Sequence, residues 1–332
     1  MDKITWPSAL LALLILAISF LVSFFAFRIA IPRLRRQGIV GEDMHKPDHP
    51  AVAEMGGLLL VFGFAGGILT IIAANTFLSR FLSVNLTMIV AALSTVLIMA
   101  LIGVLDDLMK LRQVIKALLP LFAAIPLVAV RAGDTTMHIP FMGLVDFGIV
   151  YSLVLVPLGV TGAANAVNML AGFNGEEAGV GLIGVAFLAS IAYIHHETAA
   201  FLILIAAFGA ILATLVYNWY PAKVFIGDVG TFSIGAIIAS AVIIGNMELA
   251  GVVVIIPYVL EFLVKARNRF PSKDWWLRCE GGKLFCDQSR PKGLGQLIAK
   301  AKGGMRERDI VLSIMGLETV CGALALWLFW HP

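Results

Sequence analysis

Charged residues are scarce in this chain. Only 14% of its 332 residues are Asp, Glu, Lys or Arg, whereas 60% are hydrophobic and the mean hydropathy is +0.96. A soluble domain is about a quarter charged, so the composition excludes an ordinary soluble protein. Long apolar runs recur from end to end, and they predict membrane-spanning helices, because a helix satisfies its own backbone hydrogen bonds within the bilayer.

The apolar runs predict ten spans, each close to the roughly 20 residues that cross a bilayer. They cover residues 6–28, 55–74, 84–105, 114–130, 147–162, 179–194, 199–217, 231–246, 249–265 and 309–330. The expected fold class is therefore an all-α polytopic membrane protein. We expect a single integral membrane domain over residues 1–332, with a long basic loop at 266–308.

Basic residues lie almost entirely on one side of these predicted spans. All 24 Lys and Arg residues except Lys3, Arg80 and Arg131 fall on the side of the first loop. Because basic loops stay in the cytosol, we expect the first loop inside and both termini outside. On the outer side, residues 131–146 predict a small turn or hairpin.

Cysteine is also rare, with three residues in the chain. Cys321 lies within an apolar run, and Cys279 and Cys286 lie in the last cytosolic loop, where disulfides rarely persist. That pair supplies too few ligands for a structural zinc site. We therefore expect neither a disulfide framework nor a zinc centre.

Polar residues that end or interrupt the apolar runs gather on the cytosolic side. Asp106 and Asp107 close the third run, residues 165–177 follow the fifth, and Asp228 follows the seventh. Ionisable groups at membrane depth are costly and tend to mark a site or a paired structural contact. We expect an active-site groove at this membrane surface.

The first polar motif is GVLDDLMKLRQVIK, residues 103–116. Adjacent carboxylates point about 100° apart on a helix, so one can face a cleft while the other meets a cation. The alternative is a solvated loop in which Asp106 and Asp107 pair with Lys110 and Arg112.

The second motif is NMLAGFNGEEAG, residues 168–179. Glycine lets the backbone approach a ligand, and asparagine offers both an acceptor and a donor. Such a loop can hold a base edge, a sugar or hydrated Mg²⁺. The alternative is a polar interhelical turn.

The third motif is NWYPAKVFIGDVGTFSIG, residues 218–235. The ring of Phe225 can stack on a base, and Asp228 can bind a hard cation. The alternative is an interfacial aromatic belt followed by a helix-capping aspartate.

The basic segment ARNRFPSK, residues 266–273, follows the ninth run. Because an arginine fork binds phosphate in bidentate fashion, Arg267 and Arg269 are candidates to bind a pyrophosphate. The alternative is an ordinary basic loop that touches anionic lipid.

Together the three motifs resemble the polyprenyl-phosphate N-acetylhexosamine-1-phosphate transferase superfamily. Adjacent aspartates, then LR, then a lysine nine residues after the second aspartate are similar to its second cytosolic loop. NMLAGFNGEEAG and VFIGD are similar to motifs of the branch that uses UDP-GlcNAc and dolichyl phosphate. The resemblance covers about residues 41–275 and implies ten helices around a cytosolic groove.

The activity that this resemblance implies is transfer of GlcNAc-1-phosphate from UDP-GlcNAc to a dolichyl or other polyprenyl phosphate. The products would be a lipid-linked GlcNAc pyrophosphate and UMP, in the first step of lipid-linked glycan assembly for N-glycosylation. The alternatives are a related transferase for another UDP-N-acetylated sugar, and a transporter of a polyprenyl lipid or solute. A transporter predicts internal repeats, and the two halves of the chain show no convincing similarity.

The resemblance also assigns roles to single residues. They are Mg²⁺ ligands (with Mn²⁺ as a substitute) at Asn168 and Asp228, uracil contacts at Phe225 and Asn174, catalytic aspartates at Asp106 and Asp107, a phosphate-binding lysine at Lys116, and a carboxylate near the nucleotide sugar at Glu54.

Two departures from the family pattern concern the basic segment. Asn268 stands where eukaryotic relatives have the histidine of Arg-His-Arg, so we expect Arg267 and Arg269 to bind the pyrophosphate and sugar. The last loop lacks the histidine cluster of the bacterial branches, which argues against peptidoglycan and O-antigen precursors as products.

The partners expected from the resemblance are UDP-GlcNAc, a polyprenyl phosphate, the lipid bilayer and a second copy in a homodimer, with no nucleic acid. The chain lacks the longer last-loop insertion of eukaryotic relatives. This favours the plasma membrane of a prokaryote, of archaeal type, over the endoplasmic reticulum.

Overall fold

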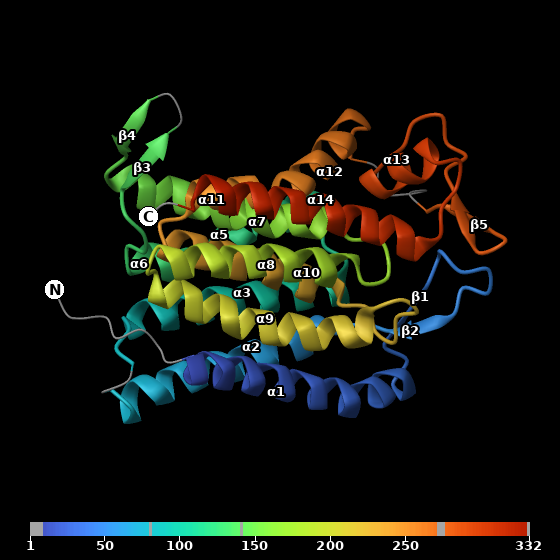
Figure 1. Ribbon diagram of the computed structural model, residues 1–332. Helices are drawn as coiled ribbons and strands as arrows, with labels where there is room; N and C mark the ends of the chain where they lie inside the picture. Colours follow the sequence, from blue (N-terminus) through green and yellow to red (C-terminus); the bar gives the residue numbers. More distant parts are fainter. Residues whose placement is uncertain (1–8, 80–81, 140–141, 271–275, 331–332) are drawn as a thin grey trace.

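The computed structural model describes residues 9–79, 82–139, 142–270 and 276–330. Its long helices run side by side along one direction (Figure 1). Eight helical segments of the described residues are long and apolar enough to cross a membrane. They are α1 (Ala9–Arg36), α2 (Gly57–Phe77), α3 (Leu86–Met109), the π-helical turn η1 (Tyr151–Leu155) continued by α7 (Val156–Leu170), α8 (Glu176–Ile194), α9 (Thr198–Asn218), α10 (Gly227–Ile244) and α14 (Glu307–Leu328). The predicted all-α polytopic membrane protein is confirmed.

Two further predicted spans are broken in the structure. The helices α11 (Glu248–Val254) and α12 (Ile256–Arg267) meet at a bend of 58° and form a ninth span if counted as one. Residues 113–129 form three short helices, because Pro120 and Pro126 lack the N–H that a continuous helix needs. These are α4 (Gln113–Leu118), α5 (Pro120–Ala123) and α6 (Ile125–Ala129). Among the described residues, eight helices, or nine with the bent pair, are long and apolar enough to span, and residues 113–129 form a shorter apolar segment, so the count of ten stays a prediction.

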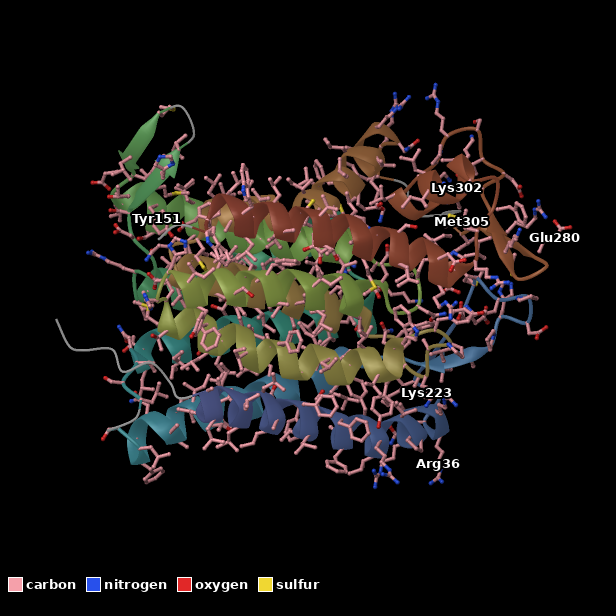
Figure 2. All side chains as sticks on the ribbon, viewed as in Figure 1. Arg36, Tyr151, Lys223, Glu280, Lys302 and Met305 are labelled. Atoms are coloured by element: carbon pink, nitrogen blue, oxygen red, sulfur yellow. The ribbon has the colours of Figure 1, made fainter. Side chains whose placement is uncertain are left out.

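The two ends of the bundle differ. At one end, on the left of Figure 1, α1 begins and α14 ends. The same end carries the hairpin of β3 (Thr136–Ile139) and β4 (Gly143–Asp146). This hairpin confirms the prediction for residues 131–146. The other end carries the antiparallel pairs β1 (Val40–Glu42) with β2 (Ala51–Ala53) and β5 (Arg278–Glu280) with β6 (Lys283–Phe285), and the short helix α13 (Leu294–Ala301). Figure 2 places Arg36, Lys223 and Lys302 at that second end, and Tyr151 at the first.

Helix α10 is the centre of the bundle. It packs against α2, α3, α7 and α9, and 89% of its apolar window is buried. Glycines bring two neighbours onto its first turn: a Cβ built at Gly103 of α3 would lie 2.5 Å from Val229 Cα, and one built at Gly57 of α2 would lie 2.0 Å from Gly230 N. Backbone atoms cannot give way to such a side chain, so these contacts require glycine. They bring the start of α2 and the last turns of α3 against the start of α10.

Candidate functional site

Asp107, in the last turn of α3, holds the first turn of α10. Its Oδ1 accepts a hydrogen bond from Asp228 N at 2.9 Å, and its Oδ2 accepts one from Val229 N at 3.4 Å. The first amides of a helix have no partner within the helix, and here a carboxylate supplies one. Gly227 has φ +66°, and a Cβ built on it would lie 2.5 Å from Asp107 Oδ2. The Gly-Asp sequence is therefore a requirement of this contact.

Lys116 joins the other aspartate of α3 to α10. Its ammonium lies 2.6 Å from Asp106 Oδ2 and also forms an ion pair with Asp228. Asp106 is buried, and its Oδ1 accepts a hydrogen bond from Leu111 N at 2.9 Å. Helix α3 ends at Lys110, whose φ of +50° turns the chain so that α4 carries Lys116 back to the aspartates. The structure thus pairs Asp106 with Lys116 rather than with the nearby Lys110 or Arg112.

Asn168 completes a group that we call the aspartate cluster: Asp106, Asp107, Lys116, Asn168 and Asp228. Its side-chain amide donates to Asp228 Oδ1 and, at 2.8 Å, to Thr231 Oγ1. The predicted loop over 168–179 is wrong in extent, because α7 continues to Leu170 and α8 begins at Glu176. Val167 and Leu170 are buried and extend the helix, which leaves only residues 171–175 as the loop.

The sequence motifs predicted only one member, Asn174, of a second group of polar residues. We call it the loop cluster: Asp43, His45, Lys46, Asn174 and Glu307. Asn174 donates from its backbone N to Glu307 Oε1 at 2.9 Å and from Nδ2 to Asp43 Oδ2 at 2.8 Å. Lys46 lies 3.2 Å from Asp43 Oδ2 and forms an ion pair with Glu307. The cluster therefore joins the β1–β2 turn, the 171–175 loop and the start of α14.

Charges within the loop cluster are balanced locally. Burial lowers the pKa of His45 to about 4, against the raising effect of Asp43, and Lys46 lowers it further. The imidazole is therefore neutral near pH 7, and it stacks on Phe173 with ring centroids 4.7 Å apart. Burial would lower the pKa of Lys46, but Glu307 and Asp43 raise it above its usual value. Lys46 thus remains a cation between these two carboxylates.

The two clusters differ in their fitness for a metal ion. Ligand atoms of Asp43, His45 and Glu307 lie within 4.8 Å of one another, but the Lys46 ammonium already pairs with both carboxylates and leaves a net charge of only −1. The aspartate cluster has three carboxylates for one ammonium, together with the amide of Asn168. Carboxylate and amide oxygens with excess negative charge suit a hard cation such as Mg²⁺.

A cavity of about 430 Å³ is lined by members of both clusters. They are Asn168 and Asp228 of the aspartate cluster and Asp43, His45, Asn174 and Glu307 of the loop cluster, and the lining also includes Glu54, Phe225 and Lys265. Phe225 is fixed by its backbone, because its N donates to Ala53 O at 2.7 Å and its O accepts from Gly56 N at 2.9 Å. A volume of this size is typical of small-molecule sites.

The predicted arginine pair lies outside this lining. Arg267 ends α12 and Arg269 follows it, and both are exposed. Lys265, which lies in the last turn of α12, lines the cavity instead. Lys265 and Glu261 lie four residues apart on one helix face, which is the sequence signal that would have pointed to it.

Comparison with known proteins agrees with this geometry. Residues 88–246 match the model of glycosyl transferase family 4. A Saccharolobus solfataricus protein provisionally named UDP-N-acetylglucosamine–dolichyl-phosphate N-acetylglucosaminephosphotransferase is 34% identical over 316 residues, 95% of each chain. The chain belongs to glycosyl transferase family 4.

Two other relatives of this glycosyl transferase family 4 member carry the same activity in their names. A Sulfolobus acidocaldarius protein, also provisionally named, is 35% identical over 316 residues, 95% of each chain. The Dictyostelium discoideum protein of that name is 26% identical over 286 residues, which are 73% of this chain and 68% of the relative. The family match contains every member of the aspartate cluster and only Asn174 of the loop cluster.

We predict that Gly227→Ala destabilises the family 4 protein. A residue with a Cβ pays about 1–2 kcal/mol for positive φ, and here its Cβ also collides with Asp107. Thermal melts of the purified protein in detergent should show a clear loss. The control is Gly162→Ala in α7, where a built Cβ has no neighbour within 4 Å. Equal melting temperatures for both variants would contradict the role given to Gly227.

Proposed function

We propose that this family 4 protein transfers GlcNAc-1-phosphate from UDP-GlcNAc to a dolichyl or other polyprenyl phosphate, with release of UMP. The observation that carries the proposal is the cavity itself, whose lining combines the oxygen ligands Asn168 and Asp228 with the ring of Phe225 and the amide of Asn174. The names of the relatives support the same reaction. The reacting diphosphate belongs beside the aspartate cluster and the base beside Phe225.

Base recognition falls to Phe225 and Asn174 in this proposal. Phe225 offers a ring face to uracil. Asn174 is 3% exposed and lines the cavity, and its Oδ1 is buried without a hydrogen-bond partner among the described residues. A buried acceptor left unpaired is costly, and an N–H of the base would satisfy it. Glu54 is also part of the lining, and we assign it a place near the nucleotide sugar.

Asn168 and Asp228 are the residues that would hold Mg²⁺, with Mn²⁺ as a substitute. Asp228 brings a carboxylate, and the Asn168 amide, turned over, would bring its oxygen to the same place. When bound, the ion would offset charge on the pyrophosphate as UMP leaves. Lys116 pairs with Asp106 and with the cavity-lining Asp228, and we assign it the phosphate contact that the resemblance implies.

The reaction forms one P–O bond and breaks another. An oxygen of the lipid phosphate attacks the β-phosphorus, the bond from that phosphorus to the bridging oxygen breaks, and its electron pair leaves with UMP. The acceptor phosphate has a second pKa near 6, so it is mostly dianionic at pH 7 and needs no base. Asp106 and Asp107 have both oxygens engaged with Lys116 and with backbone amides, which favours positioning roles for both.

Basic residues at one end of the bundle indicate which side of the membrane the cavity faces. Arg36, Lys223 and Lys302 lie at the end that holds the cavity (Figure 2). Under the positive-inside rule that end faces the cytosol. We place the protein, as a monomer or homodimer, in a prokaryotic plasma membrane of archaeal type.

The first test measures UMP released by purified protein in detergent from UDP-GlcNAc and dolichyl phosphate. We expect release that needs the lipid and Mg²⁺, that stops with EDTA, and that Asp228→Ala reduces at least a hundredfold. Asp146→Asn, an exposed change at the opposite end, is the control and should keep full activity. Absence of release across several polyprenyl phosphates and UDP-sugars would favour the transporter alternative.

A pH profile separates positioning from base catalysis at Asp106. If Asp106 positions Lys116, then Asp106→Asn lowers the plateau rate at every pH, because the ion pair is lost throughout. The measurement is the initial rate of UMP release between pH 5 and 9. An acidic limb that moves while the plateau rate stays at the wild-type level would instead identify Asp106 as the base.

The loop cluster predicts a defect in nucleotide binding. Glu307→Gln removes the charge that pairs with Lys46 and weakens the acceptor for Asn174 N. Asn174 should then be less well placed, and we expect a KM for UDP-GlcNAc raised about tenfold, since a hydrogen bond to a charged group is worth roughly 1.5–3 kcal/mol. Asp309→Asn, in the same helical turn, should leave KM unchanged. The same KM in both variants would show that Glu307 does not position Asn174.

A further inference from the structure

The cavity has little positive charge for a ligand that carries a diphosphate. Carboxylates in its lining include Glu42, Asp43, Glu54, Asp228 and Glu307. Among the described residues of that lining, Lys265 is the sole lysine or arginine. A diphosphate is bound through cations and N–H donors, so Lys265 stands out by its position.

The ammonium of Lys265 has a donor to spare. It donates to Met169 O, and it lies 3.1 Å from Glu261 Oε1. A lysine has three N–H donors, so these two contacts leave one. The side chain is 22% exposed, and the cavity is one of the spaces it faces. Asn168 and Asp228 of the aspartate cluster line the same cavity as Lys265.

Other lysines near the site are more fully compensated. Lys46 is shared by Asp43 and Glu307, and Lys116 is shared by Asp106 and Asp228. Among the residues that the structure describes, Lys265 forms an ion pair with Glu261 alone, and Glu261 is not part of the cavity lining. Its positive charge is therefore the least neutralised of the three and the most available to an anion.

We propose that Lys265 binds the diphosphate of the nucleotide sugar, donating its remaining N–H to a phosphate oxygen. This assignment rests on the proposed transferase function and adds a substrate contact to it. Lys265 is held ready for that contact, because Glu261 accepts a hydrogen bond from Leu294 N at the start of α13 while Lys265 binds the end of α7. The pair thus fixes the ammonium between two elements before substrate arrives.

The experiment compares Lys265→Gln, Lys265→Arg and Lys302→Gln in the full-length protein. Calorimetry gives the Kd of UDP-GlcNAc, and UMP release gives KM for each substrate. A charged hydrogen bond is worth about 1.5–3 kcal/mol, so Lys265→Gln should raise Kd and KM for UDP-GlcNAc about ten- to a hundredfold. KM for the lipid phosphate should stay within about twofold of wild type by the same reasoning.

The other two variants test whether the positive charge at residue 265 is what matters, and whether its position in the cavity is needed. Lys265→Arg keeps the cation and should recover most of the affinity. Lys302→Gln makes the same chemical change at an exposed position on the same end of the bundle and should match wild type.

A structural role for Lys265 is tested by the double variant Glu261→Gln, Lys265→Gln. It removes both charges together, so it leaves no buried carboxylate without its partner. If this variant melts like wild type and still binds UDP-GlcNAc weakly, the loss comes from the missing contact to substrate. Restored affinity in the double variant would overturn the proposal.

The remaining outcomes distinguish failure of the Lys265 assignment from failure of the proposed transferase function. Wild-type Kd and KM in a folded Lys265→Gln would overturn the role of Lys265 and leave the transferase standing. A wild-type protein that neither binds UDP-GlcNAc nor releases UMP would overturn the proposed function and this inference with it.

Discussion

The site depends on the burial of negative charge at the start of the most buried helix. Asp106, Asp107 and Asp228 meet there with one lysine, Lys116, to balance them. Carboxylates at membrane depth are expensive unless they are paired or hydrogen-bonded. The chain meets that cost with backbone amides of α10, with Lys116 and with the Asn168 amide. Close helix packing at glycines makes those partners reachable.

The sequence indicated that Asp106, Asp107, Asn168 and Asp228 would gather at one membrane surface, because each follows or ends an apolar run, and the structure brings these four together. Asp106, Asp107, Asn168 and Asp228 interrupt hydrophobic segments, and a polar residue there calls for a partner. The ion pairs themselves were not predictable from local spacing, because Lys116 pairs with Asp106, ten residues earlier, and with Asp228, on another helix. Asn168 also proved helical because the buried Val167 and Leu170 extend α7 beyond the expected loop.

The other four members of the loop cluster, Asp43, His45, Lys46 and Glu307, were not predicted, for a different physical reason. Lys46 and Glu307 lie 261 residues apart and belong to segments that look like ordinary polar loops and helix starts. Neither local spacing nor hydrophobic period reports a contact between such segments. Arg267 and Arg269 show the opposite case. A basic motif looks the same in the sequence whether its side chains line a cavity or are exposed, and here Lys265 lines the cavity while the two arginines are exposed.

The range of the family match separates the aspartate cluster from most of the loop cluster. Residues 88–246 supply the whole aspartate cluster from packed helices, whereas Asp43, His45, Lys46, Lys265 and Glu307 lie outside that range. Phosphoryl transfer needs fixed charges and accurate positions, which a buried helix bundle provides. Recognition of a particular nucleotide sugar needs side chains that can differ between relatives without disturbing that core. Loops that surround the cavity meet this second need, since a change at Lys46 or Glu307 leaves the packing of α3, α7 and α10 intact.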